Sequence, residues 1–256
     1  MNRRSFLETP LAAGLVAAGA AADAPERKTP DVFELRSYTV RPGKQETLDG
    51  YLSKALIPAA RRLGLGPVGV FTDQAAANKV YVLLVHPSGD SVVTLPARLA
   101  ADATYAKAAH DYLAAPATDP VYSRVESSIL IGIEGMPKLE KPDTTRSRIL
   151  NLRIYESHNE RAGNKKVEMF NKGELDIFRR VGLTPVLFGQ AIAGALMPNL
   201  TYMLVFPDDA GRKAAWSRFV ADPAWLKLRA IPAYADKEIV SRITNLLLTP
   251  AAYSEI

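Results

Sequence analysis

The residues best placed for chemistry are an arginine and a tyrosine that recur, two positions apart, in each half of the chain. Arg36 and Tyr38 lie in one alternating segment, and Arg153 and Tyr155 lie in another. Leucines alternate with these polar residues, so a strand would place the two kinds on opposite faces. A polar pair on a covered face must be hydrogen-bonded or line a wet cavity. Each pair is therefore either a ligand contact or part of an ion pair that holds two sheets in register.

A carboxylate, Glu174, interrupts the apolar face of a helix predicted over residues 165–181, whereas the matching position in the first half is Leu56. A residue that contradicts its own pattern is often functional. Buried without a cation, Glu174 would have a raised pKa and could act as a general acid or base. At about 100° per residue, four apolar residues share its face: Val167, Phe170, Phe178 and Val181.

A structural role for Glu174 is the alternative, and the pattern favours it over catalysis, because ion pairs also perturb carboxylates. In that case Glu174 would pair with Lys172, Arg179 or an arginine of the sheet, or would tilt outward beside Gly173.

His158 follows the Arg153–Tyr155 segment on the turn into the next helix, where it could be a proton shuttle, a haem ligand or a simple turn residue. The chain has three histidines and no cysteine, and no two histidines stand at ligand spacing. A metal site is therefore not expected. No nucleotide-binding, nucleophile-elbow or zinc-protease motif is present, so the cofactor is unknown and none is expected. Whether the protein is an enzyme stays open.

Charged residues are spread along the chain, whose formal net charge is +5. The tight basic clusters all lie on predicted helices with acidic residues nearby, which is typical of solvated faces: Arg61-Arg62, Lys165-Lys166 and Arg179-Arg180. The sequence therefore predicts no nucleic-acid partner.

The N-terminus has the pattern of a twin-arginine export signal over residues 1–22. Arg3-Arg4-Ser5-Phe6-Leu7 precedes an apolar run that is too short to span a bilayer, and an alanine triplet follows as a cleavage site. We expect a mature chain without a membrane span, located in the periplasm or elsewhere outside the cytoplasm. An uncleaved amphipathic N-terminus is the alternative.

Hydrophobic periodicity predicts the order strand–helix–strand–strand–helix–strand twice. The first copy spans residues 30–136 and the second spans 148–256, with a proline-containing linker at 137–147. In the first copy, Pro58 and Pro96 should kink or interrupt the two helices. Recurrent positions support a repeat: Leu35-Arg36-x-Tyr38 with Leu152-Arg153-x-Tyr155, and Gly64-Leu65 with Gly182-Leu183.

This element order predicts two tandem ferredoxin-like units of the α+β class, packed sheet to sheet as a dimeric α+β barrel. The barrel would close within one chain or between two copies in a homodimer. We expect the leucine face of each sheet to cover the helices. The polar residues would then look into the barrel: Glu34, Arg36 and Tyr38 in the first unit and Asn151, Arg153 and Tyr155 in the second.

The second unit, Ile149 to Ile256, resembles the NIPSNAP family in its bacterial exported form, and the first matches more loosely through Glu34-Leu35-Arg36-x-Tyr38. These motifs carry the resemblance: Leu152-Arg153-x-Tyr155-Glu156-Ser157, Lys166-x-Glu168-Met169-Phe170-Asn171, Phe178-Arg179-Arg180-x-Gly182-Leu183, Met197-Pro198-Asn199-Leu200-Thr201-Tyr202-Met203 and Asp222-Pro223-x-Trp225. The resemblance implies a dimeric α+β barrel but no agreed catalytic residues, and eukaryotic members are associated with mitochondria and protein contacts.

We therefore expect the protein to bind a small apolar or aromatic molecule between its sheets, with Arg36, Tyr38, Arg153, Tyr155 and Glu174 as polar contacts. One alternative is a non-catalytic interaction or stress-related module whose barrel is filled by side chains. The other is an oxygenase-type enzyme, cofactor-independent or haem-dependent, which rests on analogy with the fold.

Overall fold

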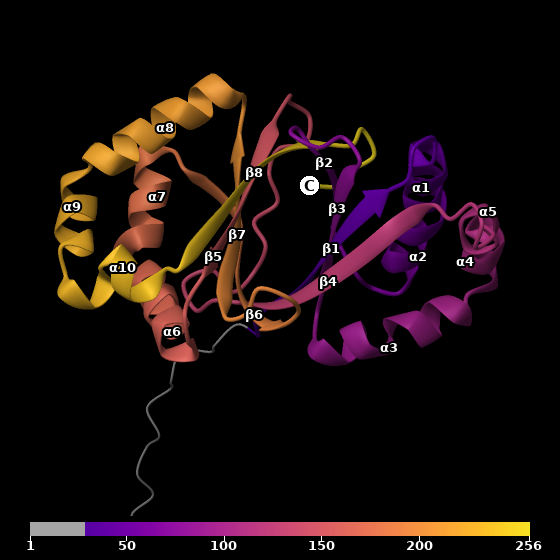
Figure 1. Ribbon diagram of the computed structural model, residues 1–256, viewed down its shortest axis with the longest axis horizontal. Helices are drawn as coiled ribbons and strands as arrows, with labels where there is room; N and C mark the ends of the chain where they lie inside the picture. Colours follow the sequence, from indigo (N-terminus) through magenta and orange to yellow (C-terminus); the bar gives the residue numbers. More distant parts are fainter. Residues whose placement is uncertain (1–28) are drawn as a thin grey trace, which may run out of the picture.

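The computed structural model describes residues 29–256, so the predicted export signal lies outside the described residues. Its strands form one closed barrel in the order β1-β3-β2-β8-β5-β7-β6-β4, with helices on both sides (Figure 1). The strands are β1 (Val32–Val40), β2 (Val68–Asp73), β3 (Lys79–His86), β4 (Tyr122–Gly132), β5 (Ile149–Glu156), β6 (Thr184–Ala193), β7 (Asn199–Phe206) and β8 (Arg242–Pro250).

Each group of four strands is a ferredoxin-like sheet, ordered β4-β1-β3-β2 in the first unit and β8-β5-β7-β6 in the second. Antiparallel pairing of β2 with β8 and of β4 with β6 joins the sheets. The predicted α+β fold with two units packed sheet to sheet is therefore confirmed, and the barrel closes within one chain. At the β4–β6 seam Gly189 permits a close approach, since a Cβ there would lie 2.7 Å from Cβ of Leu130.

Helices cover the outer face of each sheet, to the right and left of the barrel in Figure 1. The first unit contributes α1 (Gln45–Tyr51), the π-helical turn η1 (Leu52–Leu56), α2 (Ile57–Arg62), α3 (Gly89–Ala100), α4 (Ala103–Ala108) and α5 (His110–Leu113). The second contributes α6 (Glu160–Met169), the π-helical turn η2 (Phe170–Glu174), α7 (Leu175–Val181), α8 (Asp209–Ala221), α9 (Pro223–Arg229), the 3-10 turn η3 (Pro232–Tyr234) and α10 (Asp236–Ile239).

The expected orientation of the two sheet faces is wrong. Leu35, Leu150 and Leu152 point into the barrel, whereas the polar residues beside them face the helices. The barrel interior is a buried apolar core: Phe33, Leu35, Phe71, Leu83, Val85, Leu130, Leu150, Leu152, Val186, Leu187, Ala191, Met203, Leu248 and Ile256. An eight-stranded barrel is narrow enough for its own side chains to fill, and here those side chains are apolar. Apolar side chains, and not the polar residues expected as ligand contacts, therefore line the space between the sheets.

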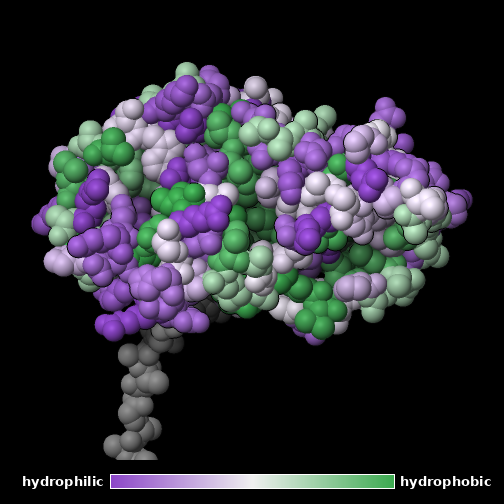
Figure 2. Space-filling model, viewed as in Figure 1, coloured by the Kyte–Doolittle hydropathy of each residue, from purple (hydrophilic) through white to green (hydrophobic). Residues whose placement is uncertain are grey.

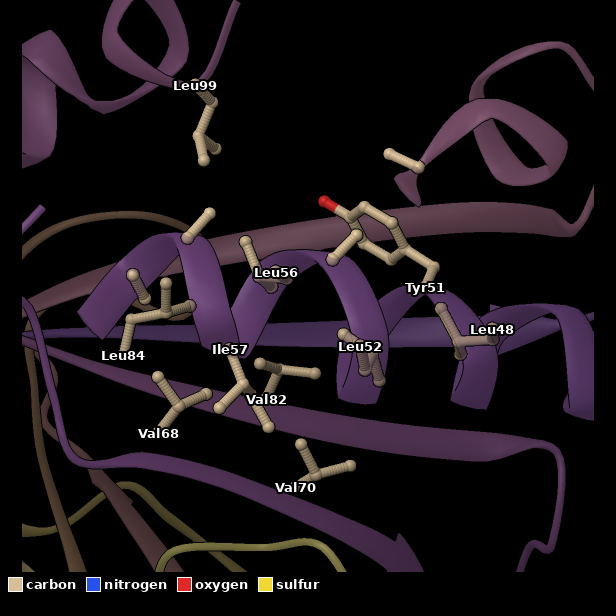
Figure 3. Packing of buried hydrophobic residues seen from close by; sticks show 14 of the residues in the cluster. Leu48, Tyr51, Leu52, Leu56, Ile57, Val68, Val70, Val82, Leu84 and Leu99 are labelled. Carbon is tan, nitrogen blue, oxygen red and sulfur yellow. The ribbon is translucent and has the colours of Figure 1, made fainter. Parts of the chain in front are cut away.

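The expected interruption at Pro96 is wrong, whereas an irregular, π-helical turn lies just before Pro58. The helix continues through Pro58, which lies in the first turn of α2 directly after the π-helical turn. Pro96 lies inside α3, and the interruption comes at Ala101 and Asp102. Figure 3 shows how this helical layer packs, with Leu52 and Ile57 directed at the strand valines Val70 and Val82. At Pro96, in the interior of α3, the helix lacks one intrahelical hydrogen bond without ending.

Hydrophobic and hydrophilic residues are interspersed on the face shown in Figure 2, and hydrophobic ones gather near α3. Val93 of that helix is 80% exposed. None of the helices within residues 29–256 combines the length and apolarity needed to cross a bilayer.

Candidate functional site

A polar cluster lies between the sheet and the helices of the second unit, on the face opposite the barrel interior. Arg153 and Tyr155 enter it from β5, and Tyr202 enters from β7, where it pairs directly with Arg153 in the sheet register. Trp216 of α8 covers Arg153, with the guanidinium carbon 4.6 Å from the indole centroid. The same carbon lies 5.3 Å from the Tyr155 ring, so the cation contacts two aromatic faces.

Arg153 has too few partners for its five N–H donors. Its Nη1 donates one long hydrogen bond, 3.3 Å, to Oδ1 of Asn245, and its Nε is buried without a partner. Within residues 29–256 no carboxylate lies within 4 Å of it. Although burial lowers the pKa of Arg153, the Tyr202 and Tyr155 hydroxyls raise it, with a net rise that keeps the cation charged.

Solvent reaches this cation along β8. Asn245 is exposed, Ile243 on the same face is 46% exposed, and Arg153 itself is partly exposed. Nδ2 of Asn151 donates to Oδ1 of Asn245 at 2.8 Å, and Oδ1 of Asn151 accepts from Nε1 of Trp216 at 3.4 Å. The rim is therefore neutral and amide-rich, and the cation beneath it is accessible from outside.

Glu174 pairs with Lys166, which is a partner that the sequence interpretation did not consider. Nζ of Lys166 lies 2.8 Å from Oε2 of Glu174, and both residues are 2% exposed. The expectation that Lys166 belongs to a solvated face is therefore wrong. Its ammonium lies over the rings of Tyr155, Phe170 and Trp225 at 5.2, 4.6 and 5.9 Å.

Burial raises the pKa of Glu174, and the charges of Lys166 and Arg153 lower it, so that the net shift is upward. A carboxylate enclosed in this way has no path to a substrate, so the geometry supports the structural role. The cluster thus holds two cations and one carboxylate, and because Glu174 pairs with Lys166, Arg153 has no carboxylate partner within 4 Å in residues 29–256.

The hydroxyl of Tyr202 donates to that of Tyr155 at 2.9 Å. Burial raises the pKa of Tyr202 well above its usual value, and the Tyr155 hydroxyl raises it further. A tyrosine held neutral in this way can donate a hydrogen bond but is no general base near neutral pH. Tyr202 therefore offers no base for removing a proton near neutral pH.

The first unit places Arg36 and Tyr38 at the equivalent positions but satisfies them internally. Nε and Nη2 of Arg36 donate to the two carboxylate oxygens of Glu34 at 2.7 and 3.0 Å. Ser127 donates to Glu34 at 3.0 Å, and Nε2 of His86 lies 3.3 Å from it, at an oblique angle. Tyr38 is 3% exposed, with its ring edge-on to that of Tyr122.

His158 lies apart from both clusters, exposed on the turn between β5 and α6. It lines a surface pocket of about 580 Å³ with Arg161, Lys165, Lys237 and other residues of α6 and α10. Among residues 29–256 no cluster of three or more acidic or histidine side chains could hold a metal ion.

The structure thus brings Arg153, Tyr155 and Glu174 together and leaves the other candidates elsewhere. Sequence reasoning missed Lys166, Tyr202, Trp216 and Asn245, and it did not include Asn151 among the ligand contacts. Asn151 had a usable signal, because it stands two residues before the arginine where the first unit has Glu34.

The second unit matches a known family. Residues 150–255 match the NIPSNAP family model, so the resemblance is confirmed for this part of the chain. No curated protein matches.

Similar solved structures cover nearly the whole chain. A protein from Lactobacillus acidophilus, provisionally named a monooxygenase, is 11% identical over 89% of this chain and 98% of that one, with a TM-score of 0.54. One from Fusobacterium nucleatum with the same name is 8% identical over 87% and 93%, with a TM-score of 0.56. An anthrone oxidase-like protein is 9% identical over 87% and 92%, with a TM-score of 0.53. At these identities the likeness shows the shared barrel fold alone.

Proposed function

We propose that the second unit binds a small anionic molecule with an aromatic body, and that Arg153 holds the negative charge. The observation that carries this proposal is the missing counter-ion. Arg36 is paired with Glu34, whereas Arg153 has no carboxylate within 4 Å in residues 29–256. A partly buried cation without a partner is costly, and an arriving anion would remove that cost.

The surroundings of Arg153 support an aromatic body for this ligand. The guanidinium lies against Trp216 and Tyr155, and Ile243 is exposed on the neighbouring strand. Ligand sites are typically apolar surfaces with a few polar groups that fix orientation. The proposed location is the helix-side face of the second unit rather than the space between the sheets.

An Arg153→Met variant is expected to bind 4-fluorobenzoate about 10- to 100-fold more weakly than the wild type, because it loses charge-assisted hydrogen bonds worth about 1.5–3 kcal/mol. Methionine retains much of the packing volume beneath Trp216. Titration followed by ¹⁹F NMR measures the dissociation constant, and neutral 4-fluorobenzamide should not show the same dependence on Arg153.

Arg229→Met is the matched control, since Arg229 also lies over a tryptophan, 5.7 Å from the Trp225 ring centroid, but on the exposed surface of α9. It should leave binding unchanged. Equal affinity in the Arg153→Met variant and the wild type would contradict the proposal, as would the absence of any binding by the wild type.

Binding is favoured here over catalysis because the cluster offers no accessible base. Solved proteins of this fold carry monooxygenase and anthrone oxidase-like names. A cofactor-independent oxygenase reaction would need a ligand that itself supplies the reactive carbon acid. A haem-dependent reaction would need a haem group, which these residues do not hold. If no anion binds, a non-catalytic interaction module is the function that would be favoured instead.

We also infer that the protein is exported through the twin-arginine signal at residues 1–22. Expression in a bacterial host should yield a periplasmic chain. Its intact mass should be lower than that of the full chain by about the mass of residues 1–22, because the alanine triplet at positions 20–22 fits a cleavage site. Replacing Arg3 and Arg4 by lysine should retain the chain in the cytoplasm. A full-length mass in the periplasm would contradict cleavage, and periplasmic recovery of the lysine variant would contradict this route.

A further inference from the structure

The two units present the same site with one difference in charge. In the sheet register Arg36 lies opposite Ser127, and Arg153 lies opposite Asn245. Two residues before each arginine, on the same face of the strand, stand Glu34 and Asn151 respectively. The arginine and its polar neighbour on the last strand are thus kept in both units, and the carboxylate is present in only one.

The Glu34 carboxylate occupies the position where a bound carboxylate would lie. It accepts from Nε and Nη2 of Arg36 in the side-on, two-bond geometry that guanidinium groups use for carboxylates, and it also accepts from Ser127. The residue is 7% exposed, so no external anion can compete for Arg36 without displacing it.

Asn151 leaves the corresponding position without a negative charge. Its amide bonds to groups other than the arginine, with Nδ2 donating to Asn245 and to the backbone oxygen of Leu246, and Oδ1 accepting from Trp216. Nε of Arg153, the counterpart of the Arg36 atom that makes the 2.7 Å bond, has no partner.

We propose that Glu34 is a built-in occupant that closes the first unit to ligands, and that asparagine at the equivalent position 151 makes the second unit the single binding site of the chain. The first unit also specifies the ligand class. Because a carboxylate fills the arginine fork there, the ligand of the second unit carries a carboxylate group. This inference rests on the proposed function and adds the ligand's charged group, the stoichiometry and the residue that decides between the units.

Exchanging the two residues tests this inference by isothermal titration calorimetry with 4-fluorobenzoate. Wild type should bind one equivalent. Asn151→Glu should weaken that binding at least 10-fold, because the new carboxylate would satisfy Arg153 as Glu34 satisfies Arg36. Glu34→Asn should add a second equivalent, which the further change Arg36→Met removes. Fluorobenzenesulfonate, whose charged group is not planar, should bind more weakly than the carboxylate.

The outcomes separate this inference from the function on which it rests. Suppose that wild type binds, that Arg153→Met abolishes binding and that Asn151→Glu leaves it unchanged. The role of Glu34 as a built-in occupant would then be contradicted, and the binding site at Arg153 would be supported. If wild type binds no anion at all, both fail. The Glu34→Asn variant leaves Arg36 unpaired and could unfold, so its circular dichroism is measured first. The Asn151→Glu variant adds a carboxylate beside Arg153 but removes the two bonds that Nδ2 of Asn151 donates, so its circular dichroism is measured as well. With its fold retained, its titration decides the question.

Discussion

A Glu174→Leu variant is expected to lose about 3–5 kcal/mol of unfolding free energy, because it leaves a buried ammonium without its counter-ion. Lys166 is 2% exposed, and Glu174 is its carboxylate partner within 4 Å in residues 29–256. The extra apolar surface of leucine cannot offset this cost. The expected loss is among the largest that a single substitution produces in a folded domain.

The double variant Lys166→Leu/Glu174→Leu should recover most of that loss. The first unit shows why, since the matching positions are Leu48 and Leu56, both fully buried in the layer shown in Figure 3. Both units carry a π-helical turn at the same place, and its last residue is Leu56 in one and Glu174 in the other. Replacing a buried ion pair by packed apolar residues is often neutral or stabilising.

Urea denaturation of the two variants and wild type measures these differences. Lys172→Leu is the control, because its ion pair with Glu168 is on the surface and should contribute little to the unfolding free energy. The double variant should also bind 4-fluorobenzoate as wild type does, if Glu174 has a structural role. A double variant less stable than Glu174→Leu would show that the pair itself stabilises the fold.

The Glu174 example shows how far a helical pattern reaches. The pattern located the carboxylate on the apolar face and showed its contrast with Leu56. It could not supply Lys166, because the lysine stands eight residues earlier, about 12 Å along an ideal α-helix. The π-helical turn between them and the long lysine side chain bring the two charges together. A separation of eight residues lies outside the three- and four-residue spacings at which partners on one helix are expected.

The strand pattern predicted the fold but inverted its faces. The alternation in β1 and β5 separates leucines from polar residues, and the β–α order predicts ferredoxin-like units. Both faces of each sheet are covered, one by the other sheet and one by helices, so alternation alone cannot say which face is inside. The deciding fact is the closure of the barrel, which leaves a narrow space that apolar side chains fill.

Only the part of the candidate site that lies on one strand could be predicted from the sequence. The repeated Arg-x-Tyr pair identified Arg153 and Tyr155, because both are local features of one strand. Trp216 and Asn245 reach Arg153 from α8 and β8, more than 60 residues away in the chain, so their contacts depend on tertiary packing. The difference in charge between the two units lies in Glu34 and Asn151, and it is visible only from the contacts of each residue.

The Glu34 network is expected to make the first unit the acid-sensitive part of the molecule. Burial alone would raise the pKa of Glu34, but the His86 imidazole and the Arg36 guanidinium outweigh it and lower the pKa to about 2. The ordinary value is 4.5. Because the folded-state pKa is lower than the unfolded one, the carboxylate stabilises the fold above about pH 4.5, and this contribution is lost as the pH falls toward about 2.

A shift of this size corresponds to about 3 kcal/mol of unfolding free energy across that pH window. The Glu34→Gln variant should be less stable than wild type at pH 7, since Arg36 loses its counter-ion, and the difference should shrink by about that amount as the pH is lowered. Urea denaturation at a series of pH values from 2 to 7 measures both curves.

Glu168→Gln is the matched control for this pH dependence. The hydrogen bonds from Lys165, Lys172 and Tyr234 also lower the pKa of Glu168 to about 2, but this carboxylate faces solvent. Screening by water and salt should make its effect on the pH curve much smaller. Parallel curves for wild type and Glu34→Gln would mean that the Glu34–Arg36 pair does not form in solution. Because a built-in occupant must be charged and bound to Arg36, that result would also remove the basis for assigning ligand binding to the second unit alone.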